Sequence, residues 1–469
     1  MTAQVAARAG VRGADGTEQL GGGQLRRRLG TEPGAEPGAE LGTGPGTGPG
    51  TVLIRTSVLK SGIRLVTESM SEVASASVGV WVGTGSRDET PTEAGISHFL
   101  EHLLFKGTKE RTARDIAEAV DAVGGDMNAY TTKEYTTFYV RALSEHLELS
   151  LDILCDILRE PALRVDDVDA ERQVILEEVL MHLDEPSDVV QERFGEAVFP
   201  DHPLGREVLG IPEVIETVSV PAIRSFFDHH YLPANMVVAA AGDVEHEAVA
   251  AEIERRFVGR QGGQAPSRSS PGARLVPVSV ERRETEQVQL VVGSRGPARR
   301  SPDRFSLAVL NHALGGGLSS RLFQEIRETR GLAYSIGSDR LAYEDAGALA
   351  VSVGTAPENA TEVLRLITRE LDQLRDGGVS ERELEVAKGH LRADLLLSLE
   401  DSGARMARIG ASLLLDDEVL SVEELEARIA SITLGDVAGA ASRVLSGNRV
   451  LAVVGPFDEA DFKPLGPLP

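Results

Sequence analysis

Two histidines and a glutamate lie close enough in this sequence to bind and use a metal ion. His98 and His102 stand four residues apart in ISHFLEHLLFKGT, where apolar residues at positions 96, 99, 100, 103 and 104 are typical of a buried helix. Residues at this spacing share one helix face, about 5–6 Å apart, so both imidazoles could bind one metal ion. Glu101 lies on the same turn and could reach a water molecule bound to that metal. The segment therefore predicts a metal centre that activates water.

Such a centre needs another ligand from elsewhere in the chain. A catalytic zinc ion takes three protein ligands and a water molecule. The stretch DDVDAERQVILEEV, residues 166–179, offers Glu171 and Glu178, which are seven residues apart and so point the same way from a helix. The alternative interpretation is an acidic helix face and two ordinary helical histidines, because the chain carries a net charge of −25.

The pattern H-x-x-E-H, the reverse of the zinc-protease pattern H-E-x-x-H, gains meaning from its context. HFLEH, with ERQVILEEV about 75 residues later, resembles the pitrilysin/insulinase family of zinc peptidases. The subgroup is the one with the catalytic subunit of mitochondrial processing peptidase and its single-chain bacterial relatives. This resemblance implies that His98, His102 and Glu178 bind one Zn²⁺ per chain. It also implies that Glu101 is the general base and that Glu171 is an acidic residue supporting the ligands.

Two further stretches are similar to family signatures. In GGDMNAYTTKEYTTFY, the resemblance places Asn128 and Ala129 along the backbone of a peptide substrate that adds itself as an extra strand. In LGGGLSSRLFQEIRETRGLAYSI, it implies that Arg327 and Tyr334 reach across a cleft and stabilise the tetrahedral oxyanion. The alternatives are an ordinary sheet strand in the first stretch and an exposed helix charge in the second.

The sequence also repeats itself at an offset of 210 residues. VGVWVG matches VQLVVG, the HFLEH helix matches FSLAVLNHALGGG, and ERQVILEEV matches ERELEVAKGHL. Three alignments at one offset indicate an internal duplication. The second copy replaces most of the metal-site residues: His98 corresponds to Ala308, Glu101 to Asn311, His102 to His312 and Glu178 to Lys388. We therefore expect one half to bind the metal and the other to keep only the fold.

The predicted fold class is α+β with two homologous halves, because 469 residues exceed a single core and the sequence repeats itself. The resemblance implies that the two halves face each other across a cleft. Each half should be a mainly antiparallel sheet with helices packed on it. Residues 1–50 are rich in glycine and proline and should form a disordered tail. We place the zinc-binding catalytic domain at 51–262, a polar linker at 263–275, and the homologous domain without the metal site at 276–469.

Composition narrows the range of partners. The net charge of −25 argues against nucleic acid as a partner. The sequence contains no run of 18 apolar residues, so we expect no membrane-spanning helix. Cys155, the single cysteine, lies among apolar helix positions in LSLDILCDIL and should be a buried, inert thiol. No apolar segment follows a basic start, and arginine outnumbers lysine. These features favour a cytoplasmic, bacterial protein.

The resemblance implies a zinc endopeptidase that hydrolyses extended or unfolded peptides. A non-catalytic core subunit, like those of the respiratory cytochrome complex, shares this fold but usually lacks the metal residues that this chain keeps. A maturation protease for one peptide, dependent on a partner, is a further alternative. The predicted zinc ligands, the glycine run at 315–317 and the segment RGLAY at 330–334 all lie in one chain, so activity need not require a second gene product. We expect a homodimer, and a paralogous partner is also compatible.

Overall fold

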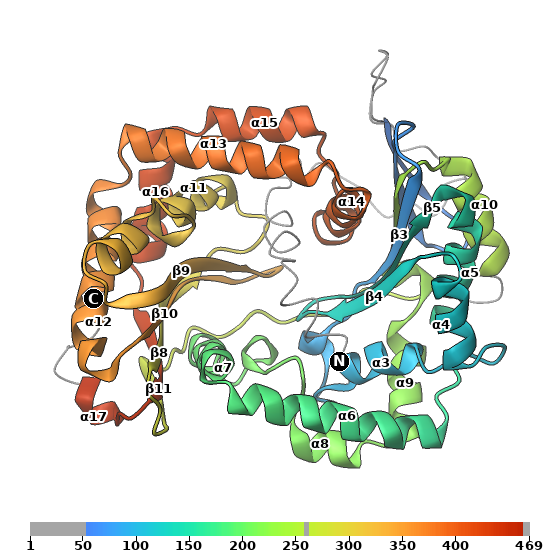
Figure 1. Ribbon diagram of the computed structural model, residues 1–469, viewed down its shortest axis with the longest axis horizontal. Helices are drawn as coiled ribbons and strands as arrows, with labels where there is room; N and C mark the ends of the chain where they lie inside the picture. The colour runs from blue at the N-terminus through green and yellow to red at the C-terminus, as the bar shows by residue number, and fades with distance from the viewer. Residues whose placement is uncertain (1–52, 258–261, 463–469) are drawn as a thin grey trace. The chain divides into compact units, whose positions relative to one another are not determined.

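The computed structural model describes residues 53–257 and 262–462, and these form two compact units (Figure 1). The described residues of unit 1 are 53–178, 207–257, 262–268 and 396–421. Those of unit 2 are 179–206, 269–395 and 422–462. The tail predicted for residues 1–50 lies outside the described residues.

Each unit contains both helices and strands. Unit 1 contains β1 (Leu53–Val58), β2 (Arg64–Ser69), β3 (Ser75–Val82), α3 (Ile96–Leu104), α4 (Ala113–Asp121), β4 (Asp126–Thr131), β5 (Thr136–Leu143), α5 (Leu147–Arg159), α8 (Pro212–Thr217), α9 (Val220–His230), β6 (Met236–Gly242), α10 (His246–Arg256) and α14 (Ser402–Asp416). Unit 2 contains α7 (Pro186–Val198), β7 (Val278–Arg282), β8 (Val288–Gly296), α11 (Arg304–Gly315), β9 (Ala333–Ala342), β10 (Gly347–Thr355), α12 (Ala360–Gly377), α15 (Val422–Ser431), α16 (Leu434–Leu445), β11 (Arg449–Gly455) and α17 (Glu459–Phe462). Two long helices belong partly to each unit: α6 (Val165–Asp184) and α13 (Glu381–Ser398). Short helical turns complete the structure: η1 (Ser86–Asp88), η2 (Ser144–His146), η3 (Pro203–Gly205), η4 (Pro233–Asn235), the π-helical η5 (Phe323–Glu328) and η6 (Pro357–Asn359).

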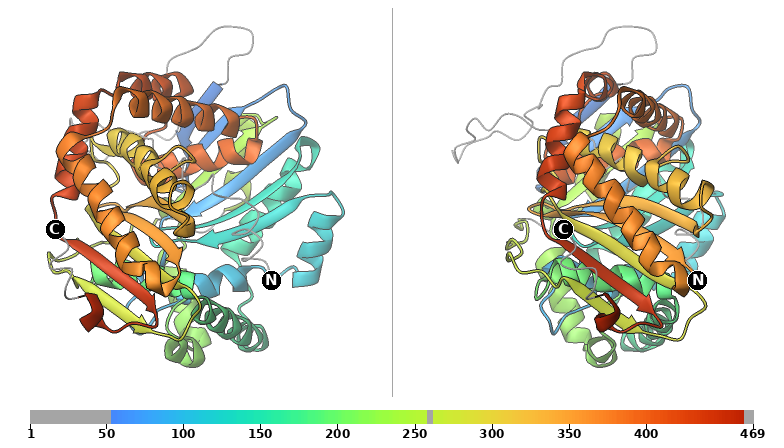
Figure 2. Two further views of the ribbon diagram at one scale, coloured as in Figure 1. Left: turned by 60° about the vertical axis from the view of Figure 1, so that its left-hand side comes forward. Right: turned by 90° about the vertical axis from the view of Figure 1, so that its left-hand side faces the viewer.

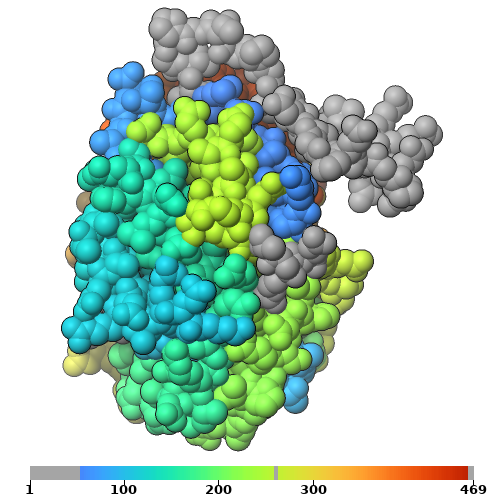
Figure 3. Space-filling model, turned by 90° about the vertical axis from the view of Figure 1, so that its right-hand side faces the viewer, coloured from blue at the N-terminus to red at the C-terminus, as the bar shows by residue number. Residues whose placement is uncertain are grey.

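Unit 1 is built on a six-stranded sheet in the order β1-β2-β6-β3-β5-β4. Neighbouring strands are antiparallel except β2 and β6, which are parallel. Helices α4, α5 and α10 lie along one face, and α14 lies along the other (Figure 1). Figure 3 shows the helical face from outside, where atoms of α5 and α10 lie side by side. Because helices cover both faces, all of β3 after its first residue is buried.

Unit 2 repeats this topology with five strands in the order β7-β11-β8-β10-β9. Its parallel pair, β7 and β11, occupies the place of β2 and β6, and the remaining neighbours are antiparallel. Helices α11, α12 and α16, the yellow, orange and red ribbons of Figure 2, each contact a strand of the sheet, and α16 also contacts α11 and α12. Helix α7 packs on β8 and β11. The mixed α+β class, with two mainly antiparallel sheets covered by helices, is confirmed.

Each unit takes one helix from the other half of the sequence. In unit 1, Trp81 packs against Met406 and Ile409 of α14, and a Cβ on Gly410 would stand only 2.6 Å from the Trp81 ring. In unit 2, Phe194 of α7 packs on the sheet, and a Cβ on Gly293 would stand 2.6 Å from its ring. Glycine is required at both contacts, because any side chain would push the helix off the sheet.

The units therefore differ from the sequence-based domains 51–262 and 276–469 by these exchanged segments. Residues 179–206 belong to unit 2 and residues 396–421 belong to unit 1. The physical reason is that each sheet has an apolar second face, which only a helix distant in sequence covers. Residues 263–275, where we place the linker, contain neither helix nor strand.

Two predictions from composition can be compared with the structure. Within 53–257 and 262–462, no helix combines the length and the apolar character needed to cross a bilayer. Cys155 is buried on α5, and burial raises the pKa of its thiol to about 12. The thiol is therefore protonated at neutral pH and unreactive there.

Candidate metal centre

Helix α3 fixes the H-x-x-E-H motif through its buried apolar side. Phe99, Leu100 and Leu103 are almost completely buried and anchor the helix in the core of unit 1. His98 and Glu101 are also buried, and the rings of His98 and His102 meet edge to face with centroids 4.7 Å apart. The predicted helix is confirmed, and its spacing brings the two imidazoles together.

The start of α3 is held by a carboxylate from outside the helix. Gly95, the residue before the helix, has φ +99°, and its Cβ would stand 2.9 Å from a backbone atom of Gly210. Glu89, which is buried, accepts hydrogen bonds from the backbone amides of Gly95 and Ser97, at 2.8 and 2.7 Å. Negative charge at a helix N-terminus satisfies free N–H groups and opposes the helix dipole, so Glu89 fixes where α3 begins.

Helix α6 brings the distant carboxylate to the two histidines. The Glu178 Oε2 atom lies 3.7 Å from His98 Nε2 and 3.5 Å from His102 Nε2. One ligand atom from each of the three residues lies within 4.8 Å of the others, a group of the kind that can hold a metal ion. Glu178, rather than Glu171, is therefore the carboxylate that faces both imidazoles.

The donor set and its surroundings fit a zinc ion. Two imidazole nitrogens and one carboxylate oxygen are a known catalytic zinc set with an open position for water. Glu178 Oε2 is buried and has no hydrogen-bond partner, which is costly unless a cation lies beside it. Burial lowers the pKa of His98 to about 3, and the charge of His102 acts in the same direction. His98 is therefore a neutral imidazole with a lone pair available for a metal.

Glu171 lies behind the ligands and does not face the metal position. Its carboxylate accepts a hydrogen bond from His102 Nδ1 at 3.1 Å and pairs with Lys106 Nζ at 2.5 Å. Burial acts to raise the pKa of Glu171, but the hydrogen bonds from His102 and Lys106 lower it overall. This bond leaves His102 Nε2 to face Glu178 and fixes the ring, as carboxylates commonly do for metal-binding histidines.

Glu101 stands on the same helix as the histidines, within a buried environment. It is 7% exposed, and Thr131 Oγ1 of β4 donates a hydrogen bond of 2.6 Å to its Oε2. Burial raises the pKa of Glu101, and the hydrogen bond from Thr131 partly opposes that change. A carboxylate with a raised pKa is a better proton acceptor, which is what activation of water requires.

The remaining predicted residues lie on β4 and in unit 2. Asn128 and Ala129 are on β4, which forms the edge of its sheet and pairs with β5. Ala129 is buried, and Asn128 Oδ1 accepts a hydrogen bond from the Ala129 amide. In unit 2, the Arg327 guanidinium lies 4.9 Å from the ring centre of Tyr334, which is 81% exposed. The structure therefore brings this second pair together at the surface of its own unit.

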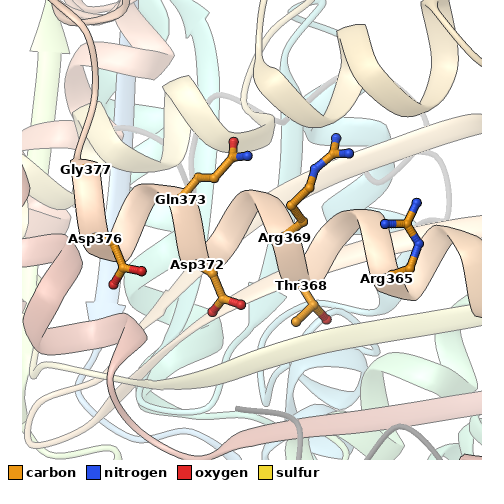
Figure 4. A pocket seen from close by; sticks show the side chains of 7 residues that line it. All are labelled: Arg365, Thr368, Arg369, Asp372, Gln373, Asp376 and Gly377. Atoms are coloured by element: carbon orange, nitrogen blue, oxygen red, sulfur yellow. The ribbon is translucent and has the colours of Figure 1, made fainter.

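An open hollow of about 600 Å³ lies along α12 in unit 2, and none of the residues named above lines it. Figure 4 shows the side chains that line it, which are Arg365, Thr368, Arg369, Asp372, Gln373 and Asp376. The charges are paired locally: Arg365 with Glu362, Arg369 with Glu325, and both aspartates with Arg375. These pairs leave no charge directed at a ligand, and we assign this hollow no role.

Sequence reasoning missed Glu89 and Thr131. Glu89 lies six residues before Gly95, whereas cap signatures are sought directly before a helix. Thr131 lies in NAYTT, a polar strand end whose alternation could indicate which residues share a face with Ala129. Neither the position of Glu89 nor the alternation around Thr131 predicts which atoms these two side chains contact.

Comparison with known proteins finds related peptidases. Residues 64–211 match the family model described as insulinase, peptidase family M16, and residues 217–391 match the one described as peptidase M16 inactive domain. An uncharacterized zinc protease of Streptomyces coelicolor is 44% identical over 415 residues, which cover 87% of this chain and 90% of that protein. The chain belongs to the insulinase family of peptidases, M16. The family expected from the sequence is thereby confirmed.

Further M16 relatives extend the agreement. A zinc protease of Mycobacterium leprae is 44% identical, over 86% of this chain and 91% of that protein. A solved protease from Helicobacter pylori has a TM-score of 0.79 at 23% identity, over 86% of this chain and 100% of that one. A structure described as the M16 inactive domain of Pseudomonas fluorescens has a TM-score of 0.80 at 20% identity, with 86% and 98% covered. These two structures support the fold, and the bacterial relatives fit the expected source.

Proposed function

We propose that this M16 peptidase is a zinc-dependent endopeptidase that hydrolyses extended or unfolded peptides. The observation that carries the proposal is one buried group: ligand atoms of His98, His102 and Glu178 within 4.8 Å of one another, with Glu101 on the turn between the histidines. Activation of water by a metal needs metal ligands and a nearby base. Helix α3 supplies two of the three ligands and the base.

The chain's own residues suit the steps of peptide hydrolysis. A zinc ion, when bound, supplies Lewis acidity that polarises a carbonyl and makes water more acidic. Glu101 would accept a proton from that water at its carboxylate and later deliver it to the leaving amine. Glu171 would keep His102 in the orientation that binds. Arg327 and Tyr334 are proposed as donors to the developing oxyanion, because of their match to the family signature.

Edge strand β4 supports the proposed substrate class. A peptide that pairs with this strand would exchange main-chain hydrogen bonds with it near Asn128 and Ala129, on the same strand as the Thr131 that contacts Glu101. Main-chain pairing requires an extended substrate and tolerates many side chains. A folded protein cannot offer such a strand without local unfolding.

The test combines metal analysis with cleavage of an unstructured peptide library by the purified chain. We expect about one zinc per chain, internal cleavage that a chelator stops, and no cleavage by Glu101→Gln although its zinc is retained. Glu177→Gln is the matched control, because Glu177 is an exposed neighbour of Glu178 on α6. An active Glu101→Gln variant would contradict the assigned base.

Other outcomes would favour the alternatives. A chain without zinc would support the non-catalytic core subunit, and zinc without cleavage would support a maturation protease that needs a partner. We also propose a homodimer and a cytoplasmic location, which were inferred from the sequence. Light scattering of the purified chain and fractionation of cells are their respective tests.

A further inference from the structure

Thr131 occupies an unusual position at the end of β4. Residues alternate between the two faces of a strand, and Tyr130 packs in the cluster beneath α14 with Trp81 and Tyr135. Ala129 and Thr131 therefore share the opposite face, where α3 lies. There the Thr131 hydroxyl donates its hydrogen bond of 2.6 Å to Glu101.

The hairpin that carries Thr131 is fixed at its turn. The Thr132 amide and hydroxyl both donate to the Tyr135 carbonyl, at 2.8 and 2.9 Å. The amides of Ser86 and Arg87 donate to the carbonyls of Thr132 and Lys133. A turn held by these bonds cannot shift without losing several of them at once.

A buried ion pair adds to this anchoring. Arg87 Nη1 lies 2.6 Å from Glu134 Oε1, and both side chains are 2% exposed. Arg268, from the segment before unit 2, pairs with Asp88 and donates to the Glu134 carbonyl at 2.7 Å. Breaking a buried pair leaves an uncompensated charge, so the turn, and with it Thr131, is held firmly.

The hydroxyl of Thr131 is also oriented by its neighbour across the hairpin. Thr136 is the residue opposite Thr131, and its single hydroxyl proton is directed to the Thr84 carbonyl at 3.1 Å, while Thr131 Oγ1 lies 3.4 Å from the same hydroxyl. The Thr131 oxygen therefore faces the Thr136 hydroxyl, and the Thr131 proton is free to point at Glu101. An ionised carboxylate only accepts hydrogen bonds, so the direction of this bond is fixed.

We propose that Thr131 is a positioning residue for the reaction, holding Glu101 Oε2 so that the other carboxylate oxygen faces the water. The inference rests on the proposed endopeptidase function. It adds that β4, the strand on which a peptide would pair, also holds the base in place, through Thr131, which lies two residues after Ala129. Peptide and base would then be placed by one rigid hairpin, as efficient proton transfer requires.

The experiment compares three variants of the zinc-loaded full chain on one cleavable peptide. Thr131→Val removes the hydroxyl but keeps the shape, and we expect kcat to fall about 10- to 100-fold with KM and zinc content unchanged. Thr131→Ser restores the hydroxyl and should recover most of kcat. Thr137→Val is the matched control, because Thr137 is a fully buried strand threonine whose hydroxyl has no hydrogen-bond partner. Its kcat should equal that of the wild type.

A second measurement does not depend on activity. Urea unfolding of Thr131→Val, Glu101→Met and the double variant forms a double-mutant cycle, and we expect non-additive midpoints because the two residues share a hydrogen bond. Additive midpoints would overturn the inference. So would an unchanged kcat in Thr131→Val, a rise in KM alone, or a loss of zinc. Failure of the proposed function would appear instead in the wild-type chain, as zinc without cleavage.

Discussion

Helix α3 and the first part of α6, in unit 1, are equivalent to helix α11 and the first part of α13, in unit 2, but their side chains differ. In unit 1, His98, His102 and Glu178 converge. In unit 2, His312 stacks on His390 with ring centres 4.2 Å apart, and Lys388 Nζ donates to the Ala430 carbonyl. Among the described residues, no group in unit 2 offers three metal ligands from histidine, cysteine, aspartate or glutamate.

This difference separates what the fold requires from what the chemistry requires. The sheets share the order of five strands and the position of one parallel pair, so both units keep the framework. Burial lowers the pKa of His312 to about 4, with a smaller effect from His390, so this histidine is neutral and serves packing. A histidine ring stacked on a second ring is accommodated without a metal, whereas the buried Glu178 oxygen has no hydrogen-bond partner and is costly without a cation beside it.

The largest expected effect comes from making unit 1 resemble unit 2. Glu178→Lys introduces the residue found at the equivalent position 388, and its ammonium would repel a cation between the two histidines. We expect loss of nearly all bound zinc and a fall in cleavage of at least about 1000-fold. Zinc content and peptide turnover measure these. Lys388→Glu is the reciprocal control and should leave both unchanged, since Ala308 supplies no ligand; zinc retained by Glu178→Lys would contradict the assignment.

The exchanged helices offer the next comparison. Phe194 of α7 is 1% exposed and packs on unit 2 through apolar contacts, so Phe194→Ala should cost about 3–5 kcal/mol. Helix α14 also carries Arg405 and Arg408, which pair with the fully buried Glu68 of β2. Glu68→Leu should cost about 3–5 kcal/mol, because two arginines lose their buried carboxylate.

These losses can be measured by denaturant unfolding. Trp81, the single tryptophan, lies under α14 and reports on that contact by its fluorescence, whereas circular dichroism reports on both units. An unfolding midpoint of Phe194→Ala equal to that of the wild type would show that α7 contributes little to unit 2.

A smaller effect concerns the pH dependence of unit 2. Burial acts to raise the pKa of Glu383, but hydrogen bonds from Arg321 and Ser380 hold it at about 2. A depressed pKa means that this contribution to stability is present above the unfolded value, about 4.3, and is lost as the pH falls towards 2. The side chain is partly exposed, so we expect Glu383→Gln to lose up to about 1 kcal/mol at pH 7. Urea unfolding should show the difference shrinking between pH 4.5 and about 2; a constant difference would contradict this prediction.

The smallest expected effect concerns Cys155, whose thiol should not react with a thiol reagent in the native protein. Cys155 belongs to unit 1 and is buried, and no other cysteine occurs in the chain. A thiol reagent should label almost none of the native protein and one thiol per chain after denaturation. Because unit 2 has no cysteine, labelling during partial unfolding reports on unit 1 alone. Rapid labelling of the native chain would show that α5 opens readily.

Most of the metal centre could be predicted from the sequence, because it depends on helical spacing. His98, Glu101 and His102 lie within one turn or so, and the seven-residue interval limited the distant ligand to Glu171 or Glu178. The spacing could not choose between these two, since both lie on one face of α6. The choice depends on the packing of α6 against α3, which only the structure shows.

The support of the site was harder to predict, because it depends on contacts between distant segments. The alternation of Val78, Val80 and Val82 predicted a strand, yet Gly79 and Trp81 on its other face gave no hint that α14, over 300 residues later, covers them. Likewise, Glu89 lies in a loop and Thr131 lies in a hairpin. No periodic sequence pattern predicts where a loop or hairpin turn places its side chains.

The exchange of α7 and α14 has a consequence for synthesis of the chain on the ribosome. All six strands of the first sheet are available once Gly242 has been made, but the helix that covers Trp81 ends at Asp416. At ~5–20 residues per second, the intervening roughly 170 residues take about 10 to 35 seconds. During that time an apolar sheet face has no cover from its own chain. A nascent chain with this arrangement therefore exposes that face until α14 has been made, and a gene divided at the linker would encode two halves that each lack a helix.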